Sequence, residues 1–148
     1  MENEMLQAGM RIINHYNSFA NRARSYGTDV TLYPSEIHLI DAIGLDGNMT
    51  TTRLAATLGI TKGGISQTVA KLTKKELITK SEGDGINEVY ISLSDKGKKA
   101  FLGHQKMHEP LITKMNRLNE EMDDKTKTAV FKMINAIDEE LMRLENEI

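Results

Sequence analysis

Cysteine and tryptophan are absent from this sequence of 148 residues, which contains only three phenylalanines and four tyrosines. Without a thiol, the chain cannot form a disulfide, a thiolate metal site or a thiol-based redox switch. No apolar run approaches the roughly 20 residues that a helix needs to cross a bilayer. The first residues, MENEML, lack the basic start and the apolar stretch of a secretory signal. From these absences we expect a cytoplasmic protein with no membrane partner.

Charge is distributed unevenly along the chain, although the net charge is only −2. Residues 50–80 contain six basic residues and one acid, a balance of +5, whereas residues 115–148 contain five basic residues and nine acids, a balance of −4. A DNA duplex attracts the first segment and repels the second, because basic side chains release the counterions of phosphates. A lysine-rich face that contacts only solvent is the alternative interpretation.

Two short helical patterns that meet at a glycine open the basic segment. Leu54, Ala55 and Leu58 share one face of the first pattern, which can bury against another helix. Gly59 stands where this helix should end, because a residue without a Cβ readily takes the left-handed conformation of a C-cap. Two short helices with a tight turn between them are the pattern of a helix-turn-helix.

The second helical pattern separates an apolar face from a polar one. Thr61 is its expected N-cap, and Ile65, Val69 and Leu72 repeat along the inner side. The outer face has no carboxylate, and its small or polar side chains allow a close approach to base edges and phosphates. These outer residues are Lys62, Gly63, Gly64, Ser66, Gln67, Thr68 and Lys71. The pattern indicates a helix that reads double-stranded DNA.

Individual roles follow from the chemistry of this outer face. Gln67 is the expected base contact, because its amide can pair with adenine, and Ser66 and Thr68 can read either strand. Lys62 and Lys71 are expected to bind the phosphate backbone. A Gln67 side chain that contacts only solvent is the alternative. The complete set of expected DNA-binding residues is Arg53, Thr61, Lys62, Gly63, Gly64, Ser66, Gln67, Thr68, Lys71, Lys74 and Lys80.

Two strand patterns follow this helix, and the turn sequence EGDG joins them. The expected strands are Leu77–Ser81 and Asn87–Leu93, the second with apolar residues at alternate positions. A hairpin beside a recognition helix is a wing, which usually carries an arginine into the minor groove. Beyond Ser81, the charged residues of this hairpin are Glu82, Asp84 and Glu88. We therefore expect no strong contact with the minor groove.

Helical patterns flank this region on both sides. A first helix is expected to end before Gly27, and a second begins at Pro34. After the hairpin, a helix is expected from Asp95 to about Arg117, with a bend at Pro110 because proline removes one backbone donor. A last helix begins at Asp123 or Asp124 and holds an apolar stripe to the C-terminus.

The apolar stripe of the last helix is too long for a domain of this size to cover, so we expect it to pair with a second copy of the chain. A stripe that packs on the first helix instead is the alternative. A two-fold dimer would place two recognition helices about 34 Å apart, one turn of B-DNA. The expected dimerisation residues are Ile12, Tyr16, Val130, Ile134, Ile137, Leu141 and Leu144.

The order of these elements resembles the MarR family of transcriptional regulators. The segments that carry the resemblance are TLYPSEIHLIDAI, LAATLGITKGGISQTVAKLTKKELI and VYISLSDKGKKAF. The resemblance implies a mainly α fold with a small β wing: an N-terminal dimerisation helix and loop at 1–33, a winged helix-turn-helix DNA-binding lobe at 34–93, and C-terminal dimerisation helices at 94–148. By position, the recognition helix is Thr61–Lys75 and the wing is Lys80–Glu88.

The resemblance also implies a function. Members of the family are generally cytoplasmic homodimers whose affinity for operator DNA changes when a small molecule occupies a pocket between the dimer helices and the DNA-binding lobe. We expect such a regulator here, acting as a repressor, with an unknown effector and no required cofactor. Most relatives have an Asp-x-Arg pattern in the wing, whereas this chain has Asp84, Gly85 and Ile86, so the arginine contact does not carry over.

The sequence also bears on two other classes of function. An enzyme is not expected, because the sequence has no phosphate loop, no nucleophile beside a histidine and no paired carboxylates that would be buried. A winged-helix module that binds proteins and holds DNA only weakly is the stronger alternative, since the wing is acidic. The salt dependence of duplex binding distinguishes such a module from a DNA-binding regulator.

A zinc-responsive regulator of the same family is a further alternative, supported by three of the four histidines. His104 and His108 are spaced i and i+4 in a helix, which points both rings the same way and could supply half of a metal site. In zinc-responsive members of the family, a histidine of the second helix joins such a pair, and His38 matches that position. Those members also use an acid at the end of the first helix, where Ala20–Arg24 has none. The fourth ligand would then have to be His15, Glu36 or Asp41.

Overall fold

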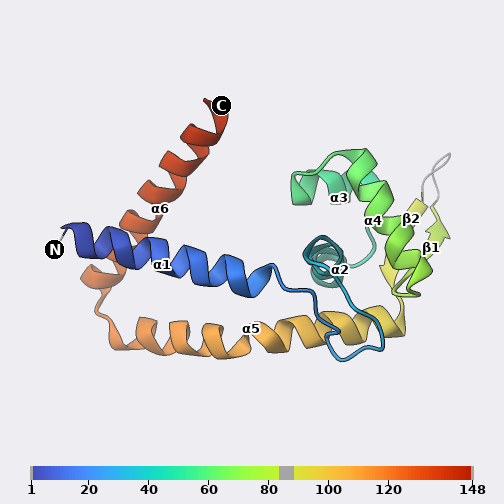
Figure 1. The fold of residues 1–148 in the computed structure, drawn as a ribbon, viewed down its shortest axis with the longest axis horizontal. Helices are drawn as coiled ribbons and strands as arrows, with labels where there is room; N and C mark the ends of the chain where they lie inside the picture. Colours follow the sequence, from blue (N-terminus) through green and yellow to red (C-terminus); the bar gives the residue numbers. More distant parts are fainter. Residues whose placement is uncertain (1, 84–88, 148) are drawn as a thin grey trace. The chain divides into compact units, whose positions relative to one another are not determined.

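The protein is described by a computed structural model that covers residues 2–83 and 89–147. Within these residues, helices and a two-stranded antiparallel sheet follow one another along the chain (Figure 1). The elements are α1 Glu2–Ala20, α2 Pro34–Asp46, α3 Thr51–Leu58, α4 Lys62–Lys74, β1 Ile78–Glu82, β2 Val89–Leu93, α5 Asp95–Glu121 and α6 Asp124–Asn146. The expected fold class, mainly α with a small β wing, is confirmed.

The chain divides into two compact units, residues 1–107 and 108–148, with the boundary inside α5. The first unit contains a hydrophobic core in which α2 contributes the largest share, with Ile37, Leu39, Ile40 and Ile43 almost fully buried. Helices α3 and α4 and strand β2 all contact α2. Their buried side chains, such as Leu54, complete the core, which holds the helix-turn-helix and the wing as one lobe.

The turn between α3 and α4 has the two caps that the sequence predicts, at Gly59 and Thr61, and Thr50 is a further cap at the start of α3. The Thr50 hydroxyl accepts the Arg53 N–H at 3.2 Å, and Gly59 ends α3 in the left-handed conformation with φ of 64°. The Thr61 hydroxyl then accepts the Gly64 N–H at 3.2 Å and begins α4. Each cap satisfies a backbone group that the helix end would leave unpaired, so the turn is determined locally.

The end of α4 differs from the expectation, which placed a strand from Leu77. The Leu77 N–H donates to the Leu72 carbonyl and the Glu76 N–H donates to the Thr73 carbonyl, each at 3.0 Å. This pair of bonds is a Schellman motif, and it holds Leu77 in the helix terminus. Strand β1 therefore starts one position later, at Ile78.

The wing is pinned to the rest of the lobe at its base. Strands β1 and β2 pair from Ile78 opposite Leu93 to Glu82 opposite Val89. Met49, just before α3, exchanges two backbone hydrogen bonds with Ile91 at 2.8 and 3.0 Å, so β2 is also tied to the start of the helix-turn-helix. Residues 84–88, which carry the expected acidic tip with Asp84, Gly85, Ile86 and Glu88, lie outside the described residues.

The second unit contains the end of α5 and all of α6. Helix α5 passes through Pro110 and continues to Glu121, beyond the expected end near Arg117. Asp123 caps α6, because its carboxylate accepts the Thr126 N–H at 2.7 Å, and this hydrogen bond lowers the pKa of Asp123 below its usual value. Across the described part of the chain, no helix combines the length and apolar character that a membrane span requires.

Replacing Glu76 by glycine should stabilise the protein. Glu76 occupies the left-handed position of the Schellman motif, with φ of 61°, which costs a residue with a Cβ about 1 kcal/mol or more. We expect Glu76→Gly to raise the free energy of unfolding in urea by about 1 kcal/mol at fixed protein concentration. Glu76→Ala, which keeps the Cβ, is the control, and an equal gain in both variants would contradict the explanation.

Candidate nucleic-acid interface

Helix α4 has the two faces that its sequence predicts. Ile65, Val69 and Leu72 are 1%, 3% and 0% exposed and anchor the helix in the core. The expected outer residues that are exposed to solvent are Lys62, Gly63, Ser66, Gln67 and Lys71. The structure therefore leaves a polar face of α4 open to a partner.

Thr68 is less available than its neighbours for reading a base. Its side chain is partly buried, and its hydroxyl donates to the Gly64 carbonyl of its own helix at 3.1 Å. A threonine inside a helix commonly makes this bond to the fourth preceding residue. Thr68 can still accept a hydrogen bond, but its hydroxyl is less free than that of Ser66 to read a base.

Most basic side chains of the lobe are exposed, and they differ in whether they form an ion pair. In the part of the chain that the structure describes, no ion pair is formed by Lys62, Lys71, Lys74 or Lys80, all of which are exposed. Arg53 lies 3.3 Å from Asp46, but both side chains are largely exposed, so this pair contributes little and Arg53 can turn to another anion.

Lys75 does not belong to the exposed basic surface, although it counts toward the +5 balance of the segment. Its ammonium group lies 2.7 Å from both carboxylate oxygens of Glu36 on α2. The linear charge balance therefore overstates the positive charge that this lobe offers to a partner, and the error arises because Glu36 lies far from Lys75 in the sequence.

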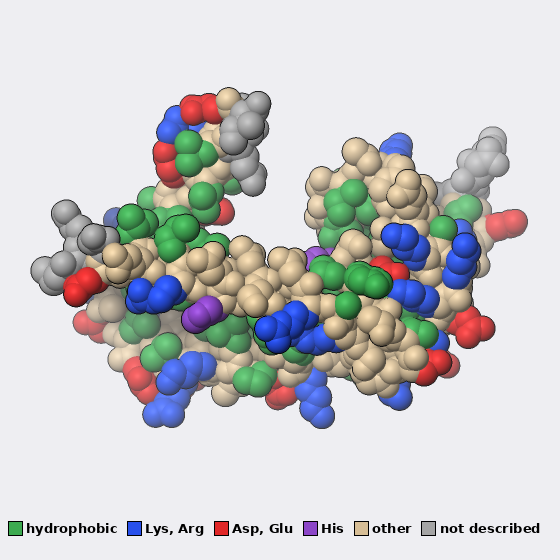
Figure 2. All heavy atoms as spheres, in the orientation of Figure 1, with side chains coloured by type: hydrophobic (Ala, Val, Ile, Leu, Met, Phe, Trp, Pro, Cys, Tyr) green, Lys and Arg blue, Asp and Glu red, His purple; other side chains and the backbone are tan. Residues whose placement is uncertain are grey.

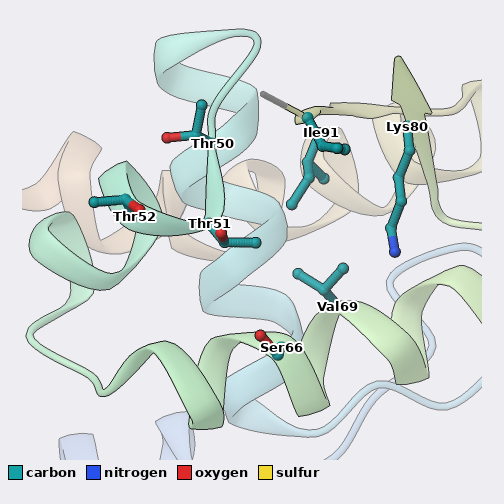
Figure 3. Close-up of a pocket in the computed structure, with 8 residues that line it drawn as sticks. Thr50, Thr51, Thr52, Ser66, Val69, Lys80 and Ile91 are labelled. Carbon is teal, nitrogen blue, oxygen red and sulfur yellow. The ribbon is translucent and has the colours of Figure 1, made fainter. Parts of the chain in front are cut away.

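A groove of about 670 Å³ lies between the start of α3, the polar face of α4 and the base of the wing (Figure 3). Ser66 from α4 and Lys80 from β1 line the groove, which Val69, Val89 and Ile91 also border. The remaining lining residues are Thr50, Thr51 and Thr52. This arrangement places hydroxyls, a cation and the first turn of a helix around one open space, a combination suited to a phosphate oxygen.

Thr51 and Thr52 are candidate site residues that the sequence interpretation missed. They stand in the first turn of α3, where backbone N–H groups have no partner within the helix. The run of three threonines before Arg53 is the signal that could have identified them, because one hydroxyl suffices for the cap that Thr50 provides. The other two remain available at the groove.

Two of the three histidines considered as candidate zinc ligands, His38 and His104, lie near each other. His104 is buried, and its Nδ1 lies 3.0 Å from Asp41 Oδ1, which also accepts the Gln105 amide at 2.6 Å. The rings of His104 and His38 are 6.2 Å apart between centroids. Among residues 2–83 and 89–147, no three His, Asp or Glu side chains converge as a group that could hold a metal ion. The described residues thus show no metal site built from the candidates His38, His104 and His108.

Glu36 and Asp41 were considered as a fourth zinc ligand, and both have other roles in the structure. Glu36 is bound to Lys75, and Asp41 is bound to His104 and Gln105. The ring of Tyr26 also meets the His104 ring edge-on, with centroids 5.5 Å apart. Hydrogen bonds and ring contacts thus join Asp41 of α2, Tyr26 of the segment before α2, and His104 and Gln105 of α5.

Comparison with known protein families gives a match to the MarR family over residues 31–85. Among curated proteins, the chain is 31% identical over 103 residues to the uncharacterised HTH-type transcriptional regulator YvnA of Bacillus subtilis, covering 67% of this chain and 66% of YvnA. The chain thus spans slightly less than two thirds of the length of this relative.

Comparison with solved structures supports the same fold. ZitR of Lactococcus lactis, described as a zinc-responsive MarR family member, was solved in complex with DNA, and this complex aligns with a TM-score of 0.74 at 21% identity over 95% of this chain and 97% of that chain. FabT of Streptococcus pneumoniae, also solved with DNA, aligns with a TM-score of 0.73 at 18% identity over 97% and 99% of the two chains. At these identities the likeness concerns the fold alone.

Proposed function

We propose that this chain, which belongs to the MarR family, is a cytoplasmic, sequence-specific DNA-binding regulator of transcription that acts as a repressor. The observation that carries the proposal is the outer face of α4, where hydroxyls, an amide and exposed lysines stand together without a carboxylate. Such a face suits the major groove of a duplex, in which polar groups read base edges and cations neutralise phosphates. The DNA complexes of ZitR and FabT support this assignment.

In the proposed complex, the exposed side chains make two kinds of contact, with bases and with phosphates. Gln67 and Ser66 project from the middle of the exposed face, so they are the residues that read bases. Lys62, Lys71 and Lys74 line the same helix, and Lys80 reaches the groove from the wing, so these lysines bind phosphates. Figure 2 shows basic side chains gathered on the part of the molecule that holds α4 and β1.

An unidentified small molecule modulates this binding in our proposal. A second cavity, of about 530 Å³, lies between the end of α2, strand β2 and the start of α5. Its lining is mostly apolar and includes Ile43, Leu93 and Phe101, and its volume suits a small ligand. A ligand here would contact both the base of the wing and the helix that begins just after it.

A homodimer is the assembly that we propose. The expected contact residues Ile12 and Tyr16 on α1, and Ile134, Ile137, Leu141 and Leu144 on α6, are between 44% and 69% exposed in the single chain. Figure 2 shows apolar side chains on the part of the molecule that holds α6. Apolar surface of this extent is unfavourable in water, and burial against a second copy removes it. Val130, the remaining expected contact, is already partly buried.

Two substitutions on the exposed face of α4 test the proposed function. Gln67→Ala should relax the sequence preference and cost about 1–3 kcal/mol on the preferred duplex. Lys71→Ala should weaken binding to all duplexes alike and reduce the salt slope by about 0.9. Selection from a random duplex pool supplies the preferred sequence, and fluorescence anisotropy supplies the affinities. The opposite pattern would overturn the assignment, and a protein-interaction module would bind little duplex even at low salt.

A charge placed in the apolar stripe of α6 tests the dimer. Ile137→Glu buries a carboxylate at the proposed interface, so light scattering at micromolar concentration should give the mass of one chain instead of two. Asn135→Glu adds the same charge to an exposed position outside the stripe and serves as the control. A wild-type protein that is monomeric, or an Ile137→Glu variant that stays dimeric, would refute the proposal.

Zinc regulation is the alternative that the similarity to ZitR favours and the arrangement of the histidines does not. We expect no bound zinc after equilibration with the metal and removal of the excess, because a stable site needs at least three protein ligands. Metal analysis and a zinc titration of duplex affinity provide the test. One equivalent of zinc that is lost in His104→Ala would establish the alternative.

A further inference from the structure

Lys75 differs from the other lysines of the lobe in how its ammonium group is used. The nitrogen lies 2.7 Å from each carboxylate oxygen of Glu36 and 2.8 Å from the carbonyl oxygen of Thr31. An ammonium group has three donors, and these three acceptors occupy all of them. Lys75 therefore has no donor left for a phosphate, although it directly follows the exposed Lys74.

Glu36 holds Lys75 in place because the Glu36 carboxylate is buried. The Glu36 side chain is only 2% exposed, and its carboxylate also accepts the Tyr33 N–H at 2.8 Å at the start of α2. If Lys75 left for a DNA phosphate, it would leave an unpaired charge in the protein interior, which is strongly unfavourable. The Tyr33 ring, whose centroid lies 5.5 Å from the ammonium nitrogen, adds a further attraction.

The segment that receives Lys75 is itself held in several places. Arg24 and Leu32 exchange two backbone hydrogen bonds at 2.8 and 3.0 Å, which close the loop before α2. Asp29 in this loop pairs with Lys96 of α5 at 2.7 Å, and the hydrogen bond from Lys96 lowers the pKa of Asp29. The carboxyl end of α4 is thus tied to a segment that leads into α2 and is ion-paired with α5.

This tie supplies a constraint that apolar packing alone does not. The buried face of α4, with Ile65, Val69 and Leu72, holds the helix on the core, but apolar contacts are non-directional and tolerate a small rotation or slide. An ion pair with three short hydrogen bonds has a defined direction and length. It fixes the end of α4 at one distance from the start of α2.

We propose that Lys75 and Glu36 are positioning residues for the recognition helix: their ion pair, in which the carboxylate is buried, sets the rotation and depth at which α4 presents Gln67 and Ser66, and Lys75 itself does not contact DNA. The inference rests on the proposed DNA-binding function and deepens it. A loss of the pair lets α4 shift by a small amount, which damages base contacts that depend on geometry more than phosphate contacts that depend on charge.

The test compares two neighbouring lysines on two duplexes. Lys75→Met and Lys74→Met each remove one charge and keep an unbranched side chain, and only Lys75 is ion-paired. The probes are the duplex selected by the wild-type protein and a scrambled duplex of the same length and composition. Lys75→Met should lower the ratio of the two affinities about tenfold and leave the salt slope unchanged. Lys74→Met should lower the slope by about 0.9 and leave the ratio unchanged.

A double variant guards against a simple loss of stability. Lys75→Met alone leaves the Glu36 carboxylate buried without a partner, whereas Glu36→Gln with Lys75→Met removes both charges and keeps an oxygen that can accept the Tyr33 N–H. This double variant should fold, shown by a cooperative urea transition, and should still lose selectivity. A purely structural role would lower the active fraction equally for both duplexes, so it would not change the ratio.

The possible outcomes distinguish a failure of this inference from a failure of the proposed DNA-binding function. A Lys75→Met variant with a reduced salt slope and an unchanged ratio would mean that Lys75 binds a phosphate, and the inference would be wrong. A folded double variant that keeps its selectivity would also overturn it. If the wild-type protein binds neither duplex, the proposed DNA-binding function is wrong. The inference about Lys75 then has no basis either.

Discussion

The amphipathic division of α4 is the constraint on which the rest of the structure depends. The helix exposes Ser66 and Gln67 because the opposite face, with Ile65, Val69 and Leu72, is buried in the core. Helix α2 contributes the largest share of that core, so the geometry of the exposed face depends on a helix outside the helix-turn-helix. The burial of the apolar face of α4 therefore leaves the polar face exposed and also determines the direction in which it points.

The lysines of the lobe have two different electrostatic roles, which the net charge of the segment does not distinguish. The exposed lysines of α4 and Lys80 of the wing create a positive surface around the groove at the start of α3. Lys75 carries the same formal charge but is paired with Glu36, so its charge stabilises the interior of the lobe. In the proposed complex, the exposed lysines attract the DNA polyanion over a distance, and Lys75 determines where α4 lies when the DNA binds.

The local features of the fold could be predicted from the sequence, because they depend on residues a few positions apart. Gly59 and Thr61 determine the turn between α3 and α4, and the sequence predicts the role of both. The start of β1 was misplaced because Glu76 takes a left-handed conformation that usually belongs to glycine, so nothing marked the Schellman motif. The ion pair of Lys75 was missed for another reason: its partner lies 39 residues away, and only tertiary folding brings the two together.

The most direct test of the account is the salt dependence of duplex binding by the wild-type protein. If the exposed lysines of α4 and the wing meet phosphates, the logarithm of the binding constant should fall linearly with the logarithm of the salt concentration, with a slope of about −0.9 for each phosphate neutralised. Tight binding at low salt with a steep slope is the predicted result. Binding that is absent at low salt, or that does not change with salt, would contradict the account.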